Sequence, residues 1–136
     1  MNLARTRTRL ARRLGATALA LAAFAMATPG TAQVPAAFAG KWKATWQTEQ
    51  RLYEAAMTVT ETGGTWQTAT RDRNNPCAGR EVPMKVESAK ADEVQLLLQF
   101  SEVIPGCTNV KVTLKTGPDG AVVGTRSKYE LKLSRP

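Results

Sequence analysis

The residues of this sequence that point most directly to chemistry are two cysteines, Cys77 and Cys107. Each stands among turn-forming residues, since Pro76 precedes the first and Pro105-Gly106 precede the second. In an oxidising compartment such a pair predicts a disulfide, and closing a loop of about 30 residues stabilises a fold by roughly 3 to 4 kcal/mol. A redox role is disfavoured because the chain has no Cys-x-x-Cys pair and no histidine to activate a thiol.

The absence of histidine excludes further classes of chemistry. Ser-His-Asp and Cys-His catalysis, histidine-ligated zinc or iron and a histidine-ligated haem all need a side chain that the sequence lacks. The 11 aspartates and glutamates fall mostly in predicted turns or on polar strand faces, where a solvated surface explains them. Gly63-Gly64 and the stretch 117–120 are turn signals rather than a phosphate loop. We predict that the protein is not an enzyme and has no catalytic residue, metal or cofactor.

The N-terminal segment predicts export. Five arginines and no acid lie within residues 1–13, an apolar run follows over 14–27, and small residues end the segment. This pattern is typical of a cleavable signal peptide, for which we predict residues 1–32, with cleavage after Ala32 and the Sec route. The apolar run is too short for a stable membrane anchor. We expect residues 33–136 to form a single periplasmic or secreted domain without a membrane span.

The charge of the predicted mature chain is modest. The whole sequence has 19 Lys and Arg against 11 Asp and Glu, a net charge of +8, but five of the arginines lie in the leader. Their removal leaves 14 against 11, a net charge of +3, which is ordinary for a protein surface. We therefore expect no nucleic-acid partner, and a monomer or weak dimer whose partner is a protein or small ligand of the cell envelope.

Apolar and polar residues alternate through most of the predicted mature chain, which indicates an all-β domain. We expect eight short antiparallel strands over 41–47, 52–60, 65–70, 82–88, 94–100, 110–114, 121–126 and 128–134. One apolar face on each strand favours a small up-and-down barrel, with a β-sandwich as the alternative. Two stretches, 49–57 and 88–93, could instead form short helices.

Two features at the ends of the strand pattern resemble the lipocalin and calycin barrels. Gly40-Lys41-Trp42 opens the first strand, and Arg135 follows the last. In that family the tryptophan closes one end of the barrel and the arginine packs across its ring, so the resemblance implies a barrel closed by Trp42 and Arg135. The chain also resembles small exported calycin-like β-barrel proteins of proteobacteria, for which the resemblance implies no activity.

Two binding sites are consistent with this fold. The first is a polar loop held by the disulfide, which with residues 101–108 would form a contact patch for a protein or an anionic ligand; its candidates are Arg71, Arg73, Asn74, Asn75 and Arg80. A solvated connection is the simpler interpretation of the loop. The second site is an apolar pocket in the barrel mouth, which the resemblance implies, lined by Tyr53, Met57, Trp66, Met84 and Phe100.

A filled core competes with the pocket, because eight short strands enclose little free space. We predict a non-enzymatic binding or inhibitor-type interaction module, with a lipocalin-like carrier of small apolar ligands as the alternative.

Overall fold

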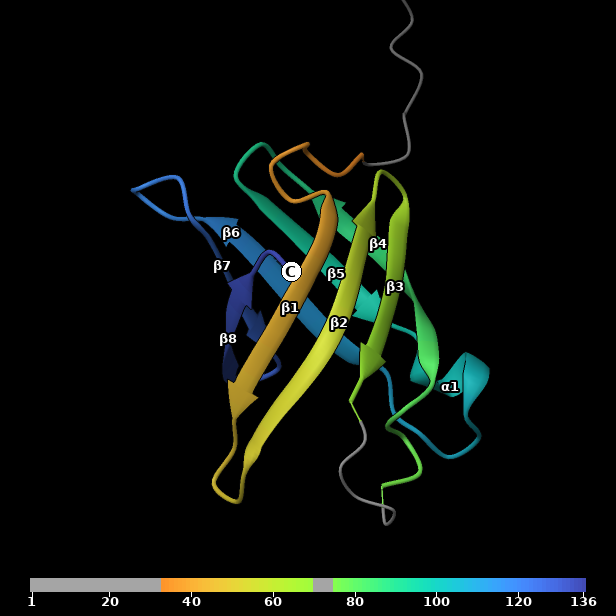
Figure 1. Ribbon diagram of the computed structural model, residues 1–136. Coiled ribbons are helices and arrows are strands. Elements are labelled where there is room, and N and C mark those ends of the chain that lie inside the picture. The colour runs from red at the N-terminus through yellow and green to blue at the C-terminus, as the bar shows by residue number, and fades with distance from the viewer. Residues whose placement is uncertain (1–32, 70–74) are drawn as a thin grey trace, which may run out of the picture.

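The computed structural model describes residues 33–69 and 75–136, and these form a closed antiparallel barrel of eight strands (Figure 1). The strands are β1 (Gly40–Gln47), β2 (Leu52–Thr60), β3 (Gly63–Thr68), β4 (Glu81–Ala89), β5 (Glu93–Leu98), β6 (Val110–Thr116), β7 (Val122–Arg126) and β8 (Tyr129–Ser134). The predicted all-β barrel is confirmed, and the sandwich alternative is wrong. The predicted signal peptide, 1–32, lies outside the described residues.

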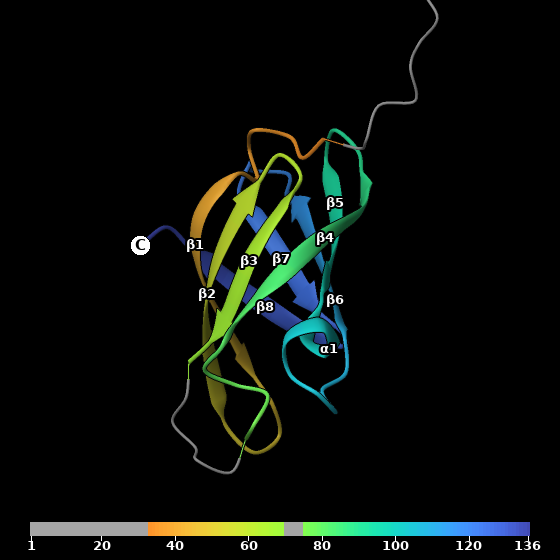
Figure 2. The same ribbon diagram turned by 90° about the vertical axis from the view of Figure 1, so that its right-hand side faces the viewer.

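Each strand pairs with its neighbours in the chain, and the barrel closes where β8 pairs with β1. The closing ladder is short, with Lys43 opposite Ser134 and Thr45 opposite Lys132. In the two views, the β1–β2 turn and the one-turn helix α1 (Phe100–Val103) lie at one end, and residues 33–39 lie at the other (Figures 1 and 2). We call these the α1 end and the N-terminal end.

Strand alternation places the core as the sequence predicts. Every strand has buried inward positions, and the largest fully buried side chains include Trp66, Met57, Leu96, Leu98, Leu114 and Leu131. Because these side chains fill the space between the strands, the barrel has a packed interior over most of its length.

Neither of the two stretches that could have formed a short helix does so, and the predicted second strand, 52–60, is confirmed. The stretch 49–57 instead holds the β1–β2 turn and the first half of β2, and the Thr48 hydroxyl accepts bonds from the amides of Gln50 and Arg51 in that turn. The stretch 88–93 joins β4 to β5 through a tight turn in which the Lys90 amide donates to the Glu93 carbonyl. In both places strand pairing with a neighbour overrides local helix propensity.

The predicted fifth strand ends too late. Its last apolar residue, Phe100, begins α1 instead of continuing β5, and its side chain is buried beneath that turn. The Gln99 amide donates to the Pro83 carbonyl as the chain leaves the sheet, and the Ile104 amide donates to the Phe100 carbonyl at the end of the helix. Phe100 therefore covers the α1 end of the core rather than extending the ladder.

The N-terminal end is closed by the pair that the family resemblance singled out. The Arg135 guanidinium carbon lies 3.5 Å from the Trp42 ring centroid. Arg135 also donates to the carbonyls of Ala39 (2.8 Å) and Lys41 (3.3 Å), and the Trp42 indole N–H donates to the Phe38 carbonyl (2.8 Å). These contacts fasten the strand ends where the β1–β8 ladder has stopped.

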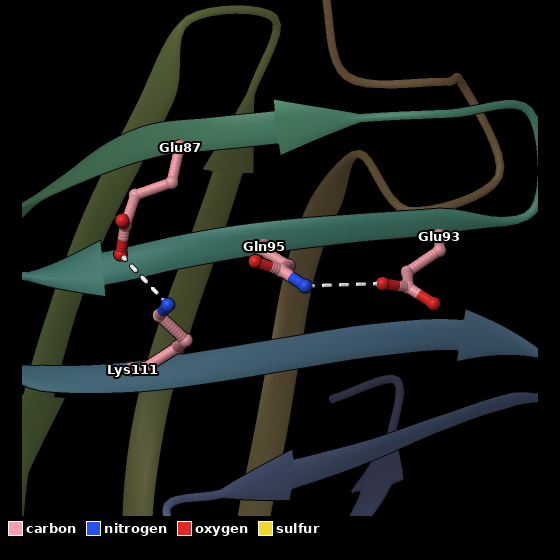
Figure 3. Close-up of polar contacts among 4 residues, drawn as sticks. All are labelled: Glu87, Glu93, Gln95 and Lys111. Atoms are coloured by element: carbon pink, nitrogen blue, oxygen red, sulfur yellow. Dashed lines mark hydrogen bonds and ion pairs between the residues drawn. The ribbon is translucent and has the colours of Figure 1, made fainter.

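The outer face of β4, β5 and β6 carries pairs of charged and polar residues, both within a strand and between strands (Figure 3). Lys111 lies 3.8 Å from Glu87, and Gln95 donates to Glu93 at 3.2 Å. The Glu93 carboxylate also lies 3.4 Å from Lys115. The Gln95 amide, more than Lys115, holds the pKa of Glu93 below its ordinary value. These exposed pairs contribute little to stability and keep this face polar.

Candidate functional site

The predicted disulfide between Cys77 and Cys107 is confirmed, with Cα atoms 5.8 Å apart. It joins the segment that precedes β4 to the segment between α1 and β6. Both segments lie at the α1 end of the barrel (Figure 2), so the bond ties them together there.

The described part of the predicted contact loop is bound into the fold. Arg80 donates to the Val103 carbonyl at 3.1 Å, across the disulfide, and the Asn75 side chain accepts a bond from the Cys77 amide at 3.1 Å. These contacts give Arg80 and Asn75 structural roles. The other candidates, Arg71, Arg73 and Asn74, lie outside the described residues, and the contact patch stays a prediction.

A pocket of about 230 Å³ opens at the α1 end of the barrel. Its described lining residues come from the β1–β2 hairpin, β3, the disulfide-linked segments, α1, β6 and β7: Trp46, Thr48, Tyr53, Thr68, Asn75, Cys77, Ala78, Phe100, Thr108, Val110 and Arg126. The pocket is smaller than the roughly 300–1,000 Å³ typical of sites for drug-sized ligands. The pocket is a shallow hollow at the end of the barrel, above the packed core, and we call it the mouth.

Only part of the predicted apolar pocket is found there. Tyr53 and Phe100 line the mouth, whereas Met57, Trp66 and Met84 are buried in the packed interior below it. The expectation that side chains fill the barrel accounts for these three, since an eight-stranded barrel is just wide enough for its own side chains.

Aromatic rings form one wall of the pocket. The rings of Trp46 and Tyr53 stack at 5.3 Å between centroids with an interplanar angle of 9°. Trp46 also packs against Trp66, whose ring lies 5.7 Å away in the core. Because Trp66 is fully buried, it supports Trp46 from below and limits the movement of the wall.

Arg126 brings a cation into the mouth. Its guanidinium carbon lies 4.8 Å from the Trp46 ring centroid, and its Nε is buried without a hydrogen-bond partner among the described residues. Burial lowers the pKa of Arg126 from its ordinary value, since a cation loses hydration there. Sequence reasoning missed this residue, although its phase with Val122 and Gly124 on β7 marks it as inward-facing.

Thr68 adds a buried hydroxyl to the pocket. It accepts a hydrogen bond from the Trp66 indole N–H at 2.9 Å. A hydroxyl can accept and donate at once, so Thr68 keeps its own proton for a further acceptor. With Thr48, Tyr53 and Thr108, it places four hydroxyl groups around the mouth, beside the aromatic rings.

A larger hollow, of about 440 Å³, lies against the outer face of β1 and β2 beside Pro136. Three charged residues, Lys41, Lys43 and Glu54, line it, and two of them, Lys43 and Glu54, pair with each other at 3.2 Å. The mouth at the α1 end is the better candidate because it holds a buried donor that lacks a partner within the described chain.

The described residues contain no group of three or more Cys, Asp or Glu placed to hold a metal ion, and no helix among them is long and apolar enough to cross a membrane. The arrangement at the α1 end is suited to binding. Comparison of the chain with models of protein families, with curated proteins and with solved structures gives no match.

Proposed function

We propose that this protein is a non-enzymatic small-ligand-binding protein of the cell envelope, and that the pocket at the α1 end of its barrel is the binding site. The observation that carries the proposal is the buried, unpartnered Arg126 Nε in a hollow walled by stacked aromatic rings. A buried donor without an acceptor is costly, and a ligand that supplies the acceptor removes that cost.

The envelope location is supported by the N-terminal pattern of the sequence and by the pairing of its two cysteines. The packed interior argues for a ligand that sits in the mouth rather than deep in the barrel. A carrier of large apolar molecules is therefore the weaker form of the proposal, and a compact ligand with polar groups is the stronger one.

The proposal is tested by recovering the protein from an oxidising compartment with its disulfide intact. We expect native mass spectrometry to detect a retained compound, or tryptophan fluorescence to change on titration with a panel of small metabolites. Trp46→Phe should abolish the fluorescence change, because Trp46 lines the pocket. Trp42→Phe, at the other end of the barrel, should preserve it.

An empty protein that gives no response to the panel would contradict the proposal and favour the interaction module. Glu substitutions of Arg71, Arg73 and Arg80 would then test that alternative. They should abolish capture of any envelope protein that the wild type retains in a pull-down.

A further inference from the structure

We infer that the pocket at the α1 end binds a small organic carboxylate, whose anionic group pairs with Arg126 and whose body packs against the Trp46–Tyr53 wall. This inference rests on the proposed function and deepens it, since it assigns the ligand a charge and a chemical class. It is carried by the unmet hydrogen-bonding capacity of Arg126, by the charge balance of the pocket and by its size.

The Nε of the Arg126 guanidinium is buried without a hydrogen-bond partner in the part of the chain that the structure describes. The ion pairs formed between described residues use lysines on the outside of the barrel, at Lys43, Lys111 and Lys115. Arg126 instead contacts the face of Trp46, which provides no acceptor oxygen. A carboxylate would provide two, in the geometry that a guanidinium binds with paired N–H donors.

The charge of the lining points to a ligand with a single negative charge. Among the described lining residues, Arg126 is the one that carries a formal charge, and the others are aromatic, aliphatic, hydroxyl or amide side chains and the disulfide. A monoanion would neutralise Arg126. A dianionic phosphate would bring a second charge without a matching cation, and a neutral ligand would leave the guanidinium unpaired.

The walls of the pocket suit a compact apolar body. Trp46 and Tyr53 present stacked rings, and Phe100 and Val110 line the mouth with them. A volume of about 230 Å³ suits a single ring or a short chain better than a long one. The Thr68 hydroxyl, which already accepts from Trp66, can donate to a second ligand oxygen.

A matched pair of probes tests the inference on the intact protein. Benzoate carries the charge and benzamide has nearly the same shape without it. We expect NMR titration of the wild type to show benzoate binding at least about tenfold more tightly than benzamide, because charge-assisted hydrogen bonds are the stronger ones. The resonances that move should belong to Trp46, Tyr53, Thr68 and Val110.

Arg126→Met should reduce the benzoate-to-benzamide affinity ratio to about one, because charge discrimination is lost with the cation. Arg126→Lys should give an intermediate ratio, since a lysine keeps the charge without the paired donors. Lys132→Met removes an exposed cation of β8 outside the pocket and should leave the ratio unchanged. The ratio in the wild type alone remains decisive if Arg126→Met fails to fold.

Several results would overturn the inference while leaving the proposed function intact. Equal binding of benzoate and benzamide at the pocket would remove the charge requirement. Tighter binding of phenyl phosphate would favour a dianion, and displacement of benzoate by equimolar sulfate would favour an inorganic ion. The proposed function itself fails if no compound, charged or neutral, perturbs the pocket resonances and the purified protein is also empty.

Discussion

Replacing Arg135 by methionine should loosen the seam at the N-terminal end of the barrel. The side chain donates to three backbone carbonyls, at 2.8, 3.3 and 3.5 Å, and its guanidinium carbon lies 3.5 Å from the Trp42 ring centroid. Each hydrogen bond contributes about 0.5–1.5 kcal/mol net, and the ring contact about 0.5–1 kcal/mol at an exposed site. Because Arg135 is exposed, values near the lower limits apply, and the loss should be about 2 kcal/mol.

Urea unfolding followed by tryptophan fluorescence measures this loss, and the melting temperature should fall by about 10 °C for a domain of this size. A double-mutant cycle with Trp42→Leu isolates the ring contact, whose coupling energy should be about 0.5–1 kcal/mol. Arg135→Lys should recover part of the stability, since one ammonium cannot reproduce both the fork and the stacked plane. A loss below about 0.5 kcal/mol for Arg135→Met, or zero coupling, would refute the reasoning.

Three further predictions concern other parts of the barrel. Replacing Cys77 and Cys107 together by alanine should lower the free energy of unfolding by about 3.6 kcal/mol, since the bond spans 30 residues; a urea midpoint close to that of the wild type would contradict this. Gln95→Leu should raise the pKa of Glu93 in an NMR titration of its carboxyl carbon, and a fall would contradict the assignment of Gln95 as the main cause. Since folding lowers this pKa, the group's stabilising contribution is full above 4.5 and is lost as pH falls through the folded value. Gly64→Ala should destabilise the fold by roughly 2 kcal/mol or more in a thermal melt, because Gly64 has φ of +114° and a β-carbon there would collide with a β2 carbonyl; an unchanged melt would show that the start of β3 can relax.

The strands of the barrel could be predicted from the sequence because each shows a two-residue period with one apolar face. The contact between Trp42 and Arg135 is an expectation from the resemblance to lipocalin and calycin barrels, and these two residues stand where β1 begins and just after β8. The stretch 49–57 illustrates the limit of this reasoning. Its residues satisfy a helical and an extended pattern, and pairing with β1 decides between them, which is a tertiary effect that local sequence does not contain.

The start of α1 could not be predicted from the sequence, for a related reason. Phe100 continues the apolar phase of β5, and Gln99 before it makes no side-chain cap that would announce a helix. The β5–β6 ladder nevertheless ends at the pair of Leu98 and Val110, so the chain leaves the sheet one residue before Phe100. Where a ladder stops depends on the partner strand, and that partner lies farther along the chain.

Only some residues of the candidate site could be predicted from the sequence. The resemblance to calycin barrels implies Tyr53 and Phe100 as pocket residues, and both do line the mouth, but Arg126 was missed. An arginine at the last inward position of a strand can place its guanidinium group in solvent or over the mouth of the barrel. Which of the two positions the guanidinium takes depends on Trp46, whose ring it contacts. Trp46 lies on β1, far from Arg126 in the sequence.

The short ladder between β1 and β8 sets the order in which the barrel can be completed. Seven ladders join strands adjacent in the chain, whereas this one joins residues about ninety positions apart. Until the final strand arrives, β1 presents an unpaired edge that another polypeptide can extend. Aggregation during folding should therefore be most sensitive to lesions in the last strand, and a small defect there should reduce the yield of soluble protein more than its equilibrium effect suggests.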